Sequence, residues 1–210
     1  YLDTIKGITF EHTGATQGVR QISITIGDVI KPTGSDHYYK KVDTSSDHTY
    51  QQADFQASYS NLCGLQGYLA NVTTTSDLTA ISTLGITTNK EAWVNGTDEC
   101  QGGIYRSGFW RYSSGPWKDK EFWRLRIDSS ADIDSVSACN ESNVRSLEPS
   151  VRVGPFETTI WASNHPAANN NDYLTYTQSA IPGIKTRSSA SSSDVEAYIV
   201  RYGGSVGDFT

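Results

Sequence analysis

Side chains that could do chemistry are few and scattered in this chain of 210 residues. Its four histidines stand at positions 12, 37, 48 and 165, far apart in the sequence. No His-Glu-x-x-His, Cys-x-x-Cys or Gly-x-Ser-x-Gly motif and no phosphate-binding loop occurs. Three acidic residues, Asp128, Asp132 and Asp134, are typical of a solvated loop, with an ion site as the alternative. We therefore predict a non-enzymatic protein with no cofactor and no metal site.

Three cysteines, Cys63, Cys100 and Cys139, permit one internal disulfide and leave three pairings open. We favour Cys100 with Cys139, because both lie in polar, loop-like sequence. That bridge would close a loop of about 40 residues and add roughly 3 to 4 kcal/mol of stability. Cys63 lies in an apolar stretch, which favours a small buried thiol.

Three Asn-x-Ser/Thr triplets begin at Asn71, Asn95 and Asn140. Such triplets are acceptors for N-linked glycans in secreted proteins, although chance produces them as readily in a Thr-rich chain. Together with a Ser-, Thr-, Asn- and Gly-rich composition and few cysteines, they favour a location outside the cell or on its surface.

Charge and hydropathy argue against nucleic-acid binding and against a membrane span. The formal net charge is −6 and the isoelectric point about 5.1, with no long run of Lys or Arg, so the sequence does not favour nucleic-acid binding. No apolar stretch approaches the roughly 20 residues needed to cross a bilayer, so we expect no membrane span. The chain contains no Met, which favours a segment of a longer precursor.

Strands are predicted towards both ends of the chain. Alternating apolar and polar residues predict a leading hairpin over residues 8–11 and 20–26 and a third strand over residues 37–42. The apolar run at residues 197–202 predicts a buried last strand.

Two helices are predicted between these strands, over residues 47–60 and 74–84. The apolar positions on or near one stripe of the first helix are Tyr50, Ala53, Phe55, Ala57 and Tyr59. Thr74 with Asp77 resembles a capping box for the second helix, and Gly85 is a natural stop.

The second half of the chain is aromatic and rich in loops. Its short apolar clusters are separated by Gly, Ser and Pro, and residues 125–155 predict a long inserted loop with a short edge strand. We expect four aromatic residues to pack in the core: Tyr50, Trp93, Trp110 and Tyr198.

Four segments, taken in order, resemble motifs of the C-type-lectin-like family. Residues 67–72 (Gly-Tyr-Leu-Ala-Asn-Val) resemble its Gly-Tyr-Leu-Ala segment, and residues 92–96 (Ala-Trp-Val-Asn-Gly) resemble its Trp-Ile-Gly segment. Residues 108–116 resemble Gly-x-Trp-x-Trp-x-x-Gly-Pro of microbial members, and residues 161–173 resemble the Trp-x-x-Gly-Glu-Pro-Asn loop. The resemblance implies an α+β fold of two helices, small antiparallel sheets and a long loop region.

The resemblance also implies a division of the chain. Residues 1–35 would form an N-terminal β-strand lead-in, and residues 36–210 the lectin-like domain. Within that domain the long loop insertion would span about residues 118–160.

Sugar-binding members of this family hold calcium with oxygens from a Glu-Pro-Asn or Gln-Pro-Asp loop and from a later Asn-Asp pair. This chain carries His165-Pro166-Ala167 in the loop and no Trp-Asn-Asp triplet before the last strand. An imidazole and a methyl group do not suit a hard cation, even with Asp172 as an acidic neighbour. We therefore expect the fold without its calcium site.

Two functions follow from the resemblance. The favoured one is an adhesion or binding module for an extracellular protein or glycan, with Trp117 and Trp123 as further exposed aromatics. The candidate contact residues of its loop are Trp161, Asn164, His165, Asn169, Asn170 and Asp172. The alternative is a structural subunit of a filament or coat, a homo-polymer assembled through residues 8–11 and 20–26.

Overall fold

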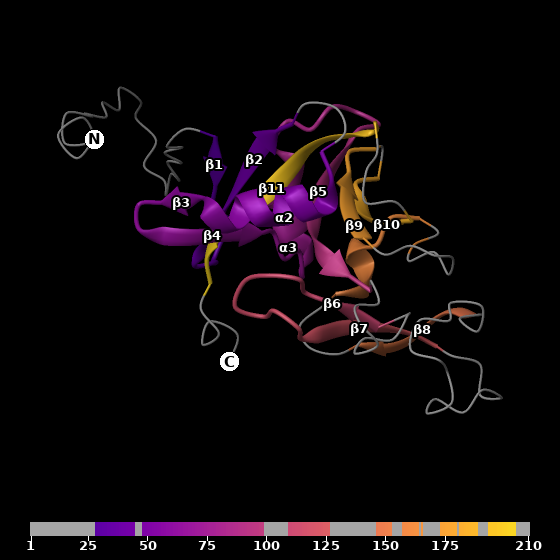
Figure 1. Ribbon diagram of the computed structural model, residues 1–210. Coiled ribbons are helices and arrows are strands. Elements are labelled where there is room, and N and C mark those ends of the chain that lie inside the picture. Colours follow the sequence, from indigo (N-terminus) through magenta and orange to yellow (C-terminus); the bar gives the residue numbers. More distant parts are fainter. Residues whose placement is uncertain are drawn as a thin grey trace, which may run out of the picture.

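The computed structural model describes residues 28–44, 48–98, 109–126, 146–152, 157–163, 165, 173–179, 181–188 and 193–204 (Figure 1). Helices in these ranges are α2 (Tyr50–Tyr59), α3 (Thr75–Ser82) and the short 3-10 helix η2 (Thr158–Ile160). The strands are β1 (Val29–Ile30), β2 (His37–Asp43), β3 (Asn61–Leu62), β4 (Leu65–Leu69), β5 (Glu91–Thr97), β6 (Phe109–Arg111), β7 (Glu121–Arg126), β8 (Ser146–Arg152), β9 (Tyr173–Thr177), β10 (Gly183–Arg187) and β11 (Val195–Gly203). The predicted hairpin over residues 8–11 and 20–26 lies outside the described residues.

The last strand, β11, lies at the centre of the sheet. It pairs antiparallel with β2 and β4 and parallel with β5, so an early strand and the last one lie side by side. β5 continues to β9 and β6, and β6, β7 and β8 follow in order. The β11–β5 pair is parallel, so it joins the antiparallel strands into one mixed sheet. The long connection from β5 to β11 leaves room for a parallel crossover.

Helix α2 begins after Thr49, which forms a capping box with Gln52. The Thr49 hydroxyl accepts from the Gln52 backbone N–H at 3.2 Å, and the Gln52 side chain accepts from the Thr49 N–H at 2.9 Å. The helix buries Tyr50, Ala53 and Ala57 against the sheet. Phe55 and Tyr59 point away from that stripe and are 62% and 73% exposed, so their predicted place near the buried face is wrong.

Helix α3 has the predicted capping box. The Thr74 hydroxyl accepts from the Asp77 backbone N–H at 3.1 Å, and the Asp77 carboxylate accepts from the Thr74 N–H at 3.1 Å. Gly85, with φ of +70°, adopts the left-handed conformation just beyond the helix end. Both signals are local in sequence, and both are confirmed.

The four aromatics predicted to pack are all buried: Tyr50, Trp93, Trp110 and Tyr198. Trp117 and Trp123 are also buried, 7% and 2% exposed, so the prediction that they form an exposed contact surface is wrong. Trp117 packs on Tyr112 with ring centroids 5.4 Å apart, and Trp123 meets Trp161 edge to face at 5.5 Å. The aromatic second half therefore builds core, because such rings bury large apolar areas.

The predicted loop over residues 118–160 contains regular structure. β7 pairs with both β6 and β8, and β8 forms the expected edge strand, while residues 127–145 lie outside the described part. Figure 1 shows β6, β7 and β8 lying together, away from α2 and α3. The end of β6 and the loop that follows it line one side of a cleft described below.

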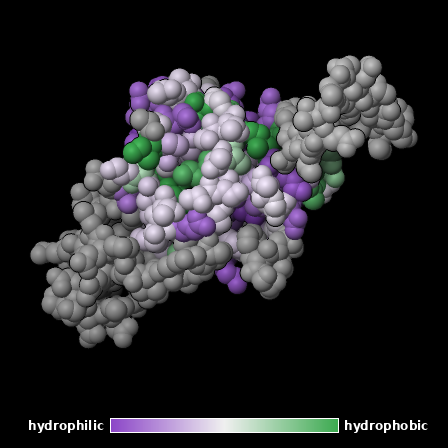
Figure 2. Space-filling view, turned by 180° about the vertical axis from the view of Figure 1, so that it is seen from behind, coloured by the Kyte–Doolittle hydropathy of each residue, from purple (hydrophilic) through white to green (hydrophobic). Residues whose placement is uncertain are grey.

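The surface is mixed in polarity. Figure 2 shows the face opposite that of Figure 1, where described hydrophobic residues form small patches among neutral and hydrophilic ones. In the described part of the chain, no helix has both the length and the apolar character of a membrane span.

Candidate functional site

The predicted loop site is represented by Trp161 and His165, because Asn164, Asn169, Asn170 and Asp172 lie outside the described residues. Trp161 follows η2, forms an isolated bridge with Ile184 of β10 and packs against Trp123. The half-buried indole is thereby fixed to the sheet on one side.

His165 is bonded to Thr186, which lies two residues after Ile184 on β10. Its Nδ1 accepts the backbone N–H of Thr186 at 3.2 Å and lies 3.1 Å from the Thr186 hydroxyl. Burial, followed by the positive charge of Lys185, lowers the pKa of the imidazole. The ring is therefore neutral at physiological pH, with Nδ1 engaged as an acceptor.

A buried ion cluster lies beside this histidine. Glu91, 3% exposed, receives Lys185 Nζ at 2.8 Å, Arg187 Nε at 2.6 Å and the Thr175 hydroxyl at 2.7 Å. Burial alone would raise the pKa of Glu91, but hydrogen bonds from Arg187 and Lys185 outweigh it and hold the pKa at about 2. The Glu91 carboxylate thus pairs with two cations, and both of its oxygens accept hydrogen bonds.

These described residues do not fit a calcium ion. Calcium requires six to eight oxygen ligands. The groups at this position are an imidazole, an ammonium and a guanidinium around one carboxylate, Glu91, whose two oxygens both accept hydrogen bonds. The acidic cluster at residues 128–134 lies outside the described residues, and among the others no group of three His, Cys, Asp or Glu side chains could hold a metal.

Two predicted glycosylation sites are contradicted by burial. Asn71 and Asn95 are each 2% exposed. The Asn95 amide donates to the Asn71 side-chain oxygen at 2.6 Å and to the Ser114 carbonyl at 3.0 Å. A glycan on either nitrogen would have no room in the folded protein. Asn140 lies outside the described residues.

The predicted buried thiol is also wrong, because Cys63 is exposed. Cys63 and Gly64 connect β3 to β4 with φ of 51° and 91°, a two-residue hairpin turn that directs side chains outward. Cys100 and Cys139, the predicted disulfide, lie outside the described residues.

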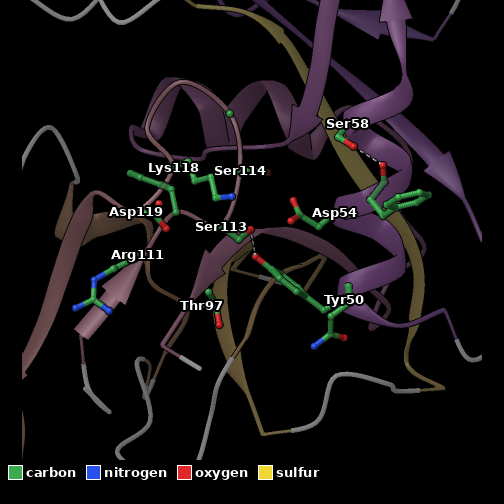
Figure 3. A pocket seen from close by; sticks show the side chains of 13 residues that line it. Tyr50, Asp54, Ser58, Thr97, Arg111, Ser113, Ser114, Lys118 and Asp119 are labelled. Atoms are coloured by element: carbon green, nitrogen blue, oxygen red, sulfur yellow. Dashed lines mark hydrogen bonds between the residues drawn. The ribbon is translucent and has the colours of Figure 1, made fainter. Parts of the chain in front are cut away.

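A second candidate site is a cleft of about 610 Å³ between α2 and the loop that joins β6 to β7 (Figure 3). Its lining is rich in hydroxyl, amide and charged groups: Tyr50, Gln51, Asp54, Phe55, Ser58, Thr97, Arg111, Tyr112, Ser113, Ser114, Gly115, Lys118 and Asp119. The sequence contained one signal for it, since Phe55 and Tyr59 do not share the i, i+3, i+7 spacing of the buried Tyr50, Ala53 and Ala57.

The carboxylate of Asp54 points into this cleft (Figure 3). Its Oδ1 is shielded from solvent and has no hydrogen-bond partner among the described residues. Burial raises the pKa of Asp54, and the facing hydroxyls of Ser114 and Ser113 oppose that shift incompletely. Asp54 is therefore an acceptor whose surroundings do not satisfy it.

No protein-family model matches the chain, and no curated protein matches it in sequence. Solved structures do match. The crystal structure of C-type lectin CEL-I from Cucumaria echinata is 15% identical, with a TM-score of 0.51 over 86% of this chain and 99% of that chain. An EPNH mutant of CEL-I is 14% identical, with a TM-score of 0.50 over 87% and 99% of the two chains. The α+β fold predicted from the four motifs is confirmed: this chain has the C-type lectin-like fold.

Proposed function

We propose that the chain is a non-enzymatic binding or adhesion module, located outside the cell or on its surface, that recognises a glycan or a protein without calcium. The observation that carries this proposal is the arrangement of Lys185 and Arg187 on Glu91 beside His165, whose Nδ1 accepts the Thr186 backbone N–H. A divalent cation there would meet two positive groups, and both oxygens of Glu91 already accept hydrogen bonds.

The loop supports a contact surface through its anchoring. Trp161 is bridged to Ile184, and His165 is bonded to Thr186, so both are fixed to β10. A preorganised contact loses less entropy on binding than a mobile one. The six contact residues proposed from the sequence, with Asn164, Asn169, Asn170 and Asp172 beside these two, remain the candidates on this loop.

The contacts of His37, which has a carboxylate partner in Asp77, support a non-catalytic role for the protein. His37 Nε2 lies 3.0 Å from Asp77, and its Nδ1 lies 3.1 Å from an Arg201 nitrogen. A general base needs one ring nitrogen directed at the nucleophile. Both nitrogens of His37 are engaged in the core, which fits a structural role.

One observation favours the alternative, a filament or coat subunit. Among the described strands, β1 ends the sheet and pairs with β2 alone, and it lies within the proposed lead-in at residues 1–35. An unpaired edge can accept a strand from another copy. Light scattering separates the two functions, since a monomer favours the binding module and polymers favour the subunit.

The proposal is tested with glycan and extracellular-protein arrays in millimolar calcium and again in excess chelator. We expect the same ligands in both conditions. Calorimetric titration with calcium should show no binding. Signals lost on chelation, or a calcium affinity that Asp172→Ala abolishes, would contradict calcium independence.

A further inference from the structure

We propose that the cleft between α2 and the β6–β7 loop binds a neutral oligosaccharide directly, with Phe55 as the stacking platform and Asp54 as the central hydrogen-bond acceptor. This inference rests on the proposed binding function and moves its glycan contacts from the long loop to the cleft beside α2. It requires no metal ion, because the cleft itself supplies donors and acceptors.

The groups that line the cleft suit hydroxyl-rich ligands. Ser58, Ser113 and Ser114 present hydroxyls, which can both donate and accept, and Gln51 adds an amide. The charged lining residues are two acids and two bases: Asp54, Asp119, Arg111 and Lys118. Because these charges balance, the cleft favours a neutral polyol over an anionic or cationic ligand.

Asp54 provides the strongest acceptor in the cleft. Its Oδ1 lacks a hydrogen-bond partner among the described residues, although the carboxylate is half-buried. An unsatisfied buried acceptor costs free energy that a ligand hydroxyl would recover. A hydroxyl bonded to an ionised carboxylate also forms a stronger bond than one between neutral groups.

The rim of the cleft carries an exposed aromatic pair. Phe55 and Tyr59, one helical turn apart on α2, are 62% and 73% exposed, with ring centroids 4.7 Å apart. Phe55 lines the cleft, whereas Tyr59 does not, and the contact between the two rings supports Phe55. Exposed, low-entropy aromatic rings beside polar groups are effective contact surfaces.

The wall opposite α2 is rigid. Ser113 Oγ lies 2.8 Å from the Tyr50 hydroxyl (Figure 3). The Ser113 backbone N–H donates to Asn95 Oδ1 at 2.8 Å. Gly115, with φ of +78°, packs so closely that an added Cβ would lie 2.4 Å from the Tyr68 ring. The site is therefore formed before the ligand arrives, which lowers the entropy cost of binding.

A second depression extends the cleft and sets the length of the ligand. It has a volume of about 510 Å³ and shares Ser58, Ser114 and Gly115 with the first. Its own lining is more apolar and includes Leu65, Tyr68 and Pro116. A ligand that spans both must be elongated, so we expect a chain of sugar rings to bind more tightly than one ring.

The experiment uses the complete chain and a printed array of neutral oligosaccharides in excess chelator. The strongest oligosaccharide from the array is then titrated calorimetrically into wild type, Phe55→Ala and Asp54→Asn. We expect each substitution to weaken binding about tenfold or more. Ile181→Ala is the matched control, since Ile181 is 72% exposed and outside the cleft, and it should change affinity less than twofold.

His165→Ala separates this inference from the proposed function. If His165→Ala abolishes binding while Phe55→Ala and Asp54→Asn retain it, the cleft is overturned and the loop module stands. If wild type binds no oligosaccharide in chelator, both glycan proposals fail. Hydrogen exchange on wild type gives a second readout that needs no variant, because the ligand should protect the amides of residues 50–59, and unchanged exchange there would overturn the cleft.

Discussion

Glu91, Asp77 and Asp54 are three of the carboxylates that are buried or half-buried in the described part of the chain, and their surroundings affect the charge differently. Glu91 and Asp77 are almost fully buried and accept several hydrogen bonds each, from cations in one case and from a helix cap and His37 in the other. Burial would raise the pKa of both, but those bonds hold each pKa at about 2. Asp54 is less buried, yet its pKa is raised, because its partners do not offset desolvation.

The difference in hydrogen bonding separates carboxylates that stabilise the fold from one that is suited to a ligand. A carboxylate with a complete set of donors stabilises the fold, whereas one left incomplete at the wall of a cleft is suited to a ligand. The two ion networks and the Asp54 cleft should therefore respond in opposite ways to acid and to neutralising substitutions.

The largest effect is expected in acid. Because Glu91 and Asp77 have lower pKa values folded than unfolded, their stabilisation is complete above pH 5 and is lost as the pH falls towards 2. Together they should remove on the order of 5 kcal/mol from the free energy of unfolding over that range. Urea denaturation at a series of pH values measures it, and a flat profile would show that the two networks contribute little.

Glu91→Gln comes next. It leaves Lys185 and Arg187 without their shared anion, and breaking such a buried pair costs about 3 kcal/mol or more. Urea denaturation at neutral pH gives the value. Asp43→Asn is the matched control, because the Asp43 side chain is 77% exposed and should change stability by less than about 1 kcal/mol.

Asp77→Asn is expected to cost about 2 kcal/mol, since one oxygen of Asp77 accepts from the Thr73 N–H, the Thr73 hydroxyl and the Thr74 N–H. An amide cannot satisfy these donors and His37 equally well. Thermal unfolding monitored by circular dichroism would record the loss. A change no larger than that of Asp43→Asn would mean that the cap is dispensable.

Asp54→Asn gives the smallest effect, with the opposite sign. A raised pKa means that the ionised form is disfavoured in the folded state, so a neutral amide should raise stability at pH 7 by up to about 1 kcal/mol. That gain should vanish in acid, where Asp54 is protonated both folded and unfolded. A clear loss of stability at pH 7 would place Asp54 with the structural carboxylates instead.

Features encoded by neighbouring residues were predictable from the sequence. The Thr74–Asp77 cap, the alternation of β2 and the apolar run of β11 are local patterns, and the structure confirms them. The order of the four family-like segments along the chain predicted the fold, and a solved structure at 15% identity confirms it.

Features that depend on distant contacts were not predictable. The Asn71–Asn95 amide pair forms only when β5 reaches the end of β4, so the two sequons looked accessible. Trp123 is covered by Trp161, and Asp54 faces a loop that begins almost 60 residues later. Neither the burial of Trp123 nor the cleft around Asp54 can be predicted from the local spacing of apolar residues.

The position of β11 has a consequence for how the protein is made. β2, β4 and β5 all pair with this one strand, which follows them in the sequence. In the β11–β2 pair, Gly203 lies opposite His37. During synthesis these earlier strands lack their shared partner until β11 leaves the ribosome. The sheet therefore forms late and slowly. We expect nascent chains that stop before residue 195 to be protease-sensitive and to require chaperones, however strong their local helix caps.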